Sequence, residues 1–275
     1  TMADFSGGHI TTEEARQLID TLNNELGSDT FRFYPGVSYR HCLVWREGLL
    51  GTKLTPPHDI TGRAIDEYLP SGDGAGELQR LMDAAQTIFR EHPLNQQRRQ
   101  HGEPPINSIW LWGAGKRPQI PCFRDKYGLA GAVISAVDLH TGLAIYAGLE
   151  PINVPGATGW LDTNYAGKVE HALKALQDKD FVFLHVEAPD EAGHQGDVKA
   201  KVQAIEDFDA KVVGPMLAGL QQRFEDHRVL LLPDHPTPIA LKTHVREPVP
   251  IAFYGSGVEP DAGQTFDESV REKGS

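Results

Sequence analysis

The spacing of apolar positions in the first third of the chain predicts helices and one antiparallel strand pair. A capping-box pattern of Thr11 and Glu14 begins the first helix. Its apolar stripe comprises Ala15, Leu18, Ile19 and Leu22. In FRFYPG, apolar and polar side chains alternate, which predicts a strand paired with the following run SYRHCLVW. Residues 76–92 return to helical spacing.

From residue 108 onward, short apolar runs alternate with segments of helical spacing. The predicted strands are SIWLW, residues 131–138, DFVFLHVEAP, HRVLLLPDH and VPIAFYG. The predicted helices are residues 140–148, 166–177 and 197–223. The last of these is expected to face inward with Val202, Ile205, Phe208, Val212 and Met216. Such alternation predicts an α/β fold with a mostly parallel sheet and helices on both faces.

A polar stretch with three prolines, from His92 to Asn107, separates the two patterns. It predicts a boundary between a smaller α+β domain at residues 1–105 and an α/β domain at residues 106–275.

Composition narrows the range of partners. The 275 residues carry a formal net charge of −12, which argues against a nucleic-acid-binding surface. No apolar run reaches membrane-spanning length. Two cysteines, Cys42 and Cys122, are far apart and fit no metal-ligand spacing, so a reducing cytoplasm is expected.

Five metal-ligand residues fall in three short clusters of the last third of the chain. They are Asp190, His194, Asp234, His235 and His244. Asp190, Asp234 and His235 lie just past two predicted strands, where parallel sheets bind ligands. Carboxylates and neutral imidazoles suit Zn, Mn or Fe, and mixed sets are common where two cations share a substrate oxygen. The plain alternative is an acidic loop with surface histidines, but the shared placement favours a metal centre.

Candidate substrate residues lie in the first segment. Arg40 and His41 interrupt an apolar run, which fits either an anion-binding guanidinium or a salt bridge on a solvent face. His58 and Asp59 fit a substrate contact or an Asx turn. Arg98, beside Arg99, reads on its own as part of a surface charge pair.

Several long runs together indicate a family. They include FYPGVSYRHCLVW, TPPHDITG, NQQRRQHGEPPINSIWLWGAGKRP, VPGATGWLDTNYAGK and HVEAPDEAGHQGD. Over nearly its whole length, the chain resembles the archaeal-type cofactor-independent phosphoglycerate mutases, which belong to the alkaline-phosphatase-like metalloenzymes.

The resemblance implies an enzyme that interconverts 3-phosphoglycerate and 2-phosphoglycerate through a phosphoserine, with two divalent ions, Mn or Zn, and no 2,3-bisphosphoglycerate. Asp190, His194 and His244 would bind one ion, and Asp234 and His235 the other. Residues 1–105 would be an inserted cap domain. The second domain would be an incomplete core, because the family's nucleophilic serine and one aspartate are expected to precede this sequence. The chain alone is therefore expected to be inactive.

The resemblance also assigns substrate handling to one set of residues, namely Arg40, His41, His58, Asp59 and Arg98. One departure leaves other small phosphorylated substrates open. Where relatives commonly carry a lysine, this chain reads DLHTG, with His140 and Thr141. The alternatives are a phosphotransferase or phosphatase, including a homoserine kinase activity proposed for relatives, or an inactive fragment that binds metal.

Overall fold

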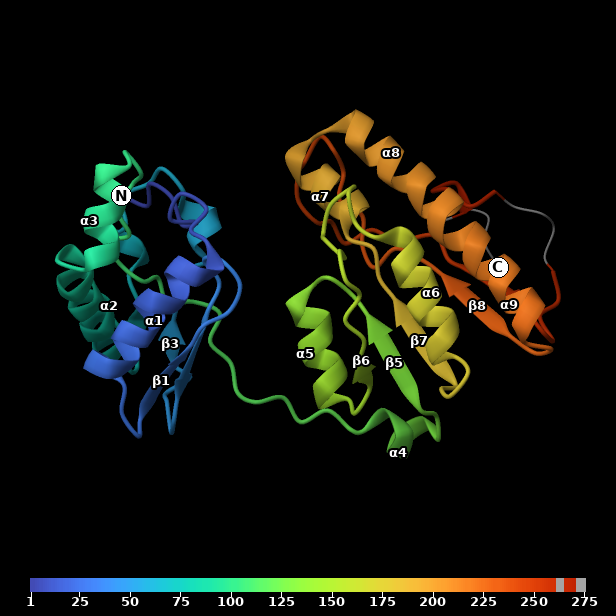
Figure 1. The fold of residues 1–275 in the computed structure, drawn as a ribbon, viewed down its shortest axis with the longest axis horizontal. Helices are drawn as coiled ribbons and strands as arrows, with labels where there is room; N and C mark the ends of the chain where they lie inside the picture. Colours follow the sequence, from blue (N-terminus) through green and yellow to red (C-terminus); the bar gives the residue numbers. More distant parts are fainter. Residues whose placement is uncertain (261–264, 271–275) are drawn as a thin grey trace. The chain divides into compact units, whose positions relative to one another are not determined.

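The computed structural model describes residues 1–260 and 265–270 and contains two compact units (Figure 1). Unit 1 is Thr1–Arg117 and unit 2 is Pro118–Ser275. The sequence placed the boundary earlier, after residue 105. The difference arises because Ile106, Ile109 and Leu111 pack on the core of unit 1. The predicted strand SIWLW is wrong, since residues 108–112 belong to no helix or strand of the described chain.

Unit 1 contains three α-helices, two short 3-10 helices and two antiparallel strand pairs. The α-helices are α1 (Thr12–Leu26), α2 (Ala75–Arg90) and α3 (Pro93–Gln100). The 3-10 helices are η1 (Pro57–Ile60) and η2 (Asp66–Tyr68). Strand β1 (Phe31–Tyr34) pairs with β2 (Cys42–Trp45), and β3 (Thr52–Lys53) pairs with β4 (Ser71–Gly72).

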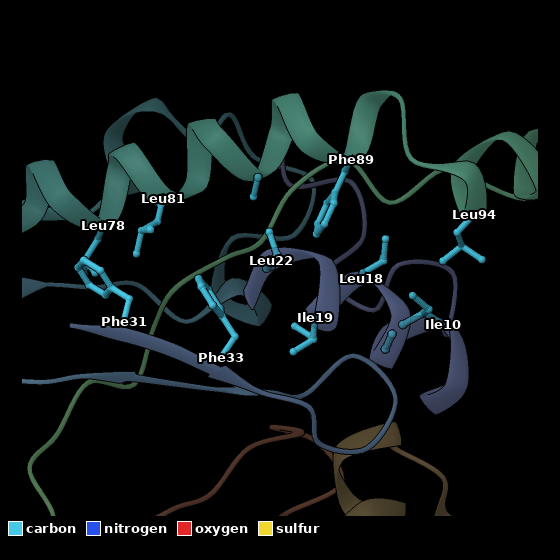
Figure 2. Packing of buried hydrophobic residues seen from close by; sticks show 12 residues of the cluster. Ile10, Leu18, Ile19, Leu22, Phe31, Phe33, Leu78, Leu81, Phe89 and Leu94 are labelled. Atoms are coloured by element: carbon cyan, nitrogen blue, oxygen red, sulfur yellow. The ribbon is translucent and has the colours of Figure 1, made fainter. Parts of the chain in front are cut away.

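The core of unit 1 lies where α1, α2 and β1 meet. The predicted capping box of α1 is confirmed, because Glu14 N–H donates to Thr11 Oγ1 and Thr11 N–H donates back to the Glu14 carboxylate. Figure 2 shows Leu18, Ile19 and Leu22 of α1 lying between α2 and β1. Alternation in β1 turns Phe31 and Phe33 into the same cluster and leaves the residues between them exposed.

The polar stretch after α2, where the sequence predicts a domain boundary, contains helix α3 and packs on unit 1. Pro93 stands at the first turn of α3, where its missing N–H costs no hydrogen bond, and the His92 ring accepts from Leu94 N–H. Asn95 is 1% exposed. Its Nδ2 donates to Phe89 O at 2.7 Å and to Ile106 O at 2.6 Å, and its Oδ1 accepts from Ile106 N–H at 2.7 Å. Polar residues thus fold inward because their hydrogen bonds are complete.

Unit 2 is built around a three-stranded parallel sheet with the order β6-β5-β7. The strands are β5 (Gly131–Ile134), β6 (Glu150–Pro151) and β7 (Phe181–Leu184). Strands β8 (Arg228–Leu231) and β9 (Ala252–Gly255) form a separate antiparallel pair. The helices are α4 (Phe123–Tyr127), α5 (Asp138–Tyr146), α6 (Tyr165–Ala175), α7 (Ala188–Gln195), α8 (Val198–Phe208) and α9 (Gly214–Arg223).

The α/β fold class and the parallel sheet are confirmed. Strand β5 is buried along its whole length between its two parallel partners, and α5 and α6 pack against it. Gly131 allows the tight pairing, since a Cβ there would lie 2.7 Å from Leu149 Cδ2. Because β5 and β7 run in parallel, their carboxyl ends meet at one edge.

The predicted long helix consists of α8, a π-helical turn at Asp209–Val213 and α9. Its predicted inward stripe is partly wrong. Val212 is buried, but Val202 and Ile205 are about half exposed. Small residues face the neighbouring helix α7 instead, with Ala200 and Ala204 buried near Ala188 and Ala192. The contact between α7 and α8 suits small side chains such as alanine, and the larger Val202 and Ile205 lie on the more exposed side of α8.

Replacement of Asn95 by alanine tests the polar clamp of unit 1. The change removes the Asn95 partner of Ile106 N–H and Ile106 O and one of the hydrogen bonds to Phe89 O, so we expect the free energy of unfolding to fall by about 3 kcal/mol. Urea denaturation followed by tryptophan fluorescence measures it. Gln96→Ala, at the exposed next position, is the matched control and should change stability by less than about 0.5 kcal/mol. Equal losses in both variants would contradict the clamp.

Candidate metal centre

The run DEAGH lies in helix α7, which is separated from the end of β7 by three residues. Asp190 and His194 are four residues apart, so they lie one turn apart on the same side. The distance from His194 Nε2 to Asp190 Oδ2 is 3.2 Å. Gly196 ends the helix in a left-handed conformation, with φ of 72°, and a Cβ there would meet the Lys242 side chain. This close approach brings the loop around residue 242 beside α7.

Two histidines from the loops after β8 complete the cluster around Asp190. His244 Nε2 lies 3.5 Å from Asp190 Oδ1 and 3.0 Å from His194 Nε2. His235 Nδ1 lies 3.9 Å from Asp190 Oδ1, and its ring centroid is 3.7 Å from that of His244. One ligand atom from each of Asp190, His235 and His244 falls within 4.8 Å of the others. Three chain segments that are far apart in sequence therefore present metal-ligand atoms to one point.

Asp234 joins this cluster from its exposed rim. Its Oδ2 lies 3.2 Å from His235 Nε2, and its side chain is 66% exposed. The predicted division into two ligand sets, with His235 paired with Asp234 and apart from Asp190, stays a prediction. In the structure His235 lies between the two carboxylates, 3.2 Å from one and 3.9 Å from the other.

The donor set fits a divalent cation. His194 Nδ1 lies 3.0 Å from Lys242 O, and a carbonyl only accepts, so Nδ1 carries the proton and Nε2 presents its lone pair to the cluster. Thr237 Oγ1 donates to Asp190 Oδ1, and Lys201 Nζ donates to Thr237 O at 2.7 Å. These outer hydrogen bonds fix the orientation of two ligands. Carboxylate oxygen with bare imidazole nitrogen suits borderline ions such as Zn or Mn.

A second polar group lies beside the cluster at the carboxyl ends of β5 and β7. Ser135 Oγ is 3.0 Å from His140 Nδ1 and 3.1 Å from His185 Nδ1. His185 Nε2 is 3.2 Å from Glu187 Oε2. Sequence reasoning missed His185 and Glu187 because it placed both inside the predicted strand DFVFLHVEAP, whereas β7 ends at Leu184. With the end of the strand at Leu184, the placement rule that selected Asp190 also selects these two residues.

Burial changes the protonation equilibria of this second group. It lowers the pKa of His185 to about 4, with the neighbouring His140 and Lys168 acting in the same direction. Burial also lowers the pKa of His140, and the carboxylate of Asp234 opposes that shift. Burial raises the pKa of Glu187 to about 7, and the negative charge of Asp190 adds to the shift. Both histidines are therefore neutral near pH 7, within electrostatic range of the metal-ligand cluster.

The predicted substrate residues of unit 1 fall into two groups. Arg40 lies over the Tyr39 ring, and ring contacts continue from Tyr39 to Phe5 and from Phe5 to His58. Asp59 Oδ1 is 3.5 Å from His58 Nε2. Arg40, His41, His58 and Asp59 are all exposed, and Arg40 and His41 precede β2, so they are not part of a buried strand.

Arg98 belongs to the interior of unit 1. It is 3% exposed, and its guanidinium donates to Glu14 at 2.7 Å, to Gly7 O at 2.9 Å and to Pro104 O at 2.9 Å. A guanidinium whose donors are taken up this way holds the first residues of the chain against α1 and α3. Substrate binding by Arg98, expected from the sequence, would require these bonds to break.

Comparison with known proteins places the chain in a family. A profile of the metalloenzyme superfamily matches residues 73–275, and one of 2,3-bisphosphoglycerate-independent phosphoglycerate mutase matches residues 1–95. A probable mutase of that name from Geobacter sulfurreducens is 52% identical over 275 residues, covering 99% of this chain and 69% of that protein. The chain belongs to the 2,3-bisphosphoglycerate-independent phosphoglycerate mutase family. The family expected from the sequence is confirmed, and with it an enzyme of a metal-dependent superfamily.

Other members of the mutase family agree. The Methanosarcina acetivorans enzyme is 51% identical over 274 residues, with 99% of this chain and 69% of that protein covered. Among solved structures, a Pyrococcus horikoshii protein gives a TM-score of 0.74 at 26% identity, covering 96% of this chain and 65% of that one. The cofactor-independent phosphoglycerate mutase of Thermoplasma acidophilum gives 0.60 at 25% identity, covering 98% and 67%. The chain thus spans about two thirds of these relatives.

The pKa of Glu187 predicts how the stability of this mutase-family chain depends on pH when metal is removed. Folding raises the pKa of the Glu187 carboxyl from 4.5 to about 7. Protonated Glu187 therefore contributes its full stability to the folded chain below pH 4.5, and this contribution is lost as the pH rises through 7. Glutamine does not ionise, so in Glu187→Gln we expect the decrease in the free energy of unfolding between low and high pH to be smaller by about 1–2 kcal/mol. The effect is less than the full pKa shift implies, because the Glu187 side chain is partly solvated. Urea denaturation in chelator at pH 4.5, 6 and 8 measures the slope. Glu170→Gln, at an exposed position of α6, should leave the slope as it is in the parent protein.

Proposed function

We propose that the protein containing this chain is a phosphoglycerate mutase that interconverts 3-phosphoglycerate and 2-phosphoglycerate and needs two divalent ions, Mn or Zn. The convergence of Asp190, His194, His235 and His244 carries the proposal. These ligands, with Asp234, would hold the ions. Bound there, the ions would neutralise phosphate charge and lower the pKa of an attacking hydroxyl. No 2,3-bisphosphoglycerate is required.

The chain's own residues set the geometry for phosphoryl transfer. Thr237 and Lys242 O orient Asp190 and His194, so their ligand atoms are in place before the substrate arrives. In unit 1, Arg40, His41, His58 and Asp59 offer exposed groups for the carboxylate and hydroxyls of glycerate. Exclusion of water matters for a mutase, because the phosphoryl group must return to glycerate and not to water. The small phosphorylated substrate and two unpaired cysteines, Cys42 and Cys122, support a cytoplasmic location.

A second candidate is transfer of the phosphoryl group to another small acceptor. The observation that favours it is DLHTG, where His140 and Thr141 stand in place of a lysine common in relatives. His140 lies beside the metal cluster, so a different acceptor would meet an imidazole in place of an ammonium group. A kinase or phosphatase activity on such an acceptor would share the same ions.

Metal binding tests the ligand assignment in the chain itself. We expect Mn²⁺ and Zn²⁺ to bind with a stoichiometry of at least one, as measured by titration calorimetry. Asp190→Asn and His194→Gln remove ligand atoms, and Thr237→Ala removes a bond that orients Asp190, so each should weaken binding by about 10–100-fold. His171→Gln, on α6 of the same unit, is the control and should bind as the parent does. Unchanged affinity in both ligand variants would refute the assignment.

Activity tests the substrate class. The full-length protein that contains this chain is incubated with 3-phosphoglycerate in the absence of 2,3-bisphosphoglycerate, and 2-phosphoglycerate is followed by phosphorus NMR. We expect turnover that is lost in chelator and restored by Mn²⁺, because phosphate charge is then neutralised again. Turnover of ATP with homoserine but not of phosphoglycerate would favour the second candidate. Metal binding without turnover of any phosphorylated substrate would point to a non-catalytic metal-binding module.

A further inference from the structure

The polar group beside the metal cluster is held in place by strands β5 and β7 and by helix α6. His185, the first residue after β7, donates its N–H to the carbonyl of Ile134, the last residue of β5, at 2.8 Å. The pairing of the two strands therefore continues to the residue next to Ser135. Lys168, which is fully buried on α6, donates from Nζ to His185 O at 2.9 Å. The rings of His140 and His185 are in edge contact, with centroids 4.2 Å apart. The group is thus a fixed constellation, not a set of surface side chains.

The hydroxyl of Ser135 has a limited hydrogen-bonding capacity. A serine hydroxyl offers one proton and two lone pairs. Val137 N–H donates to Ser135 Oγ at 3.0 Å and occupies one lone pair. One proton and one lone pair remain for two imidazole nitrogens, His140 Nδ1 and His185 Nδ1. One ring must therefore accept the serine proton, and the other must donate its own Nδ1–H.

This capacity forces the two neutral rings into opposite tautomers. When His185 accepts at Nδ1, its Nε2 carries a proton and donates to the Glu187 carboxylate, while His140 donates Nδ1–H to Ser135 and leaves its Nε2 bare. When His140 accepts at Nδ1, its Nε2 carries a proton. His185 then donates Nδ1–H to Ser135 and turns a bare Nε2 toward Glu187, whose carboxyl must be protonated to bond with it.

We propose that Ser135 is a positioning residue that couples the tautomer of His140 to the His185–Glu187 pair, so that His140 Nε2 exchanges a proton with a substrate hydroxyl during phosphoryl transfer. No hydrogen-bond partner of His140 Nε2 occurs within the described part of the chain, so this atom is available to a ligand. The inference rests on the proposed function, because it assigns the residue that removes and returns the hydroxyl proton of the substrate.

The proton movement balances along the chain of bonds. His140 Nε2 takes the proton of the attacking hydroxyl and releases its Nδ1 proton to Ser135 Oγ. Ser135 releases its own proton to His185 Nδ1, and His185 releases its Nε2 proton to the Glu187 carboxylate. Each imidazole and the serine end neutral, and Glu187 holds the proton. The reverse sequence delivers the proton from His140 Nε2 to the glycerate oxygen that is released when the phosphoryl group moves from the substrate to the enzyme.

Imidazole nitrogen NMR of the labelled protein tests the coupling without any substrate. We expect His140 and His185 to show opposite tautomers, or correlated averages that sum to one Nδ1 proton between them. Ser135→Ala should uncouple the rings and shift the His140 nitrogens, whereas Ser135→Thr keeps a hydroxyl and should restore the parent pattern. His171 on α6 is the internal control. The same Nδ1 state on both rings of the parent protein would overturn the proposal.

Kinetics give the second readout. Ser135→Ala should lower kcat by about 10²-fold with little change in KM, because the hydroxyl positions a proton-transfer group and does not bind substrate. His140→Gln should lose as much, and the double variant should lose no more than His140→Gln alone. Complete loss of the phosphorylated protein in Ser135→Ala alone would make Ser135 the nucleophile and overturn the positioning role. Opposed tautomers in a protein without mutase activity would refute only the proposed function.

Discussion

The parallel pairing of β5 with β7 is the constraint on which the chemistry of unit 2 depends. Its register aligns Ile134 with Leu184, so the residues that follow both strands leave the sheet at the same edge. Ser135 and His140 follow one strand, and His185, Glu187 and the start of α7 follow the other. A shift of one residue in this pairing would turn these side chains to the opposite face. The sheet therefore supplies the precision that a loop-borne site would lack.

The candidate metal site is built around the carboxylate of Asp190. One carboxylate lies within 4 Å of three imidazoles, and Thr237 and α7 fix its orientation. Three imidazoles around one carboxylate form a candidate ligand set for a cation. The adjoining Ser135 group is neutral by comparison, because burial keeps its two histidines uncharged. The candidate metal ligands and the residues proposed to transfer protons thus form two separate, neighbouring groups.

Unit 1 is held by different means. Its core is an apolar cluster between two helices and a hairpin (Figure 2). Beside this cluster, Asn95 and Arg98 of α3 donate to backbone carbonyls outside their own helix, and Arg98 reaches as far as Gly7. Their exposure is close to zero, and these hydrogen bonds offset the cost of burying their polar groups. This is why a stretch rich in polar residues and proline folds inward.

Local sequence patterns were sufficient to predict the amphipathic helices, the capping box at Thr11, the α/β class and the candidate metal-ligand residues past the strands. These follow from local periodicity and from the rule that parallel strands end at one edge, both of which are visible without coordinates. The tertiary structure alone decided that Arg98 is interior, that Val202 and Ile205 face outward and that His235 lies beside Asp190. It also decided the Ser135 hydrogen bonds. Such features depend on contacts between segments far apart in the chain, for which local spacing carries no information.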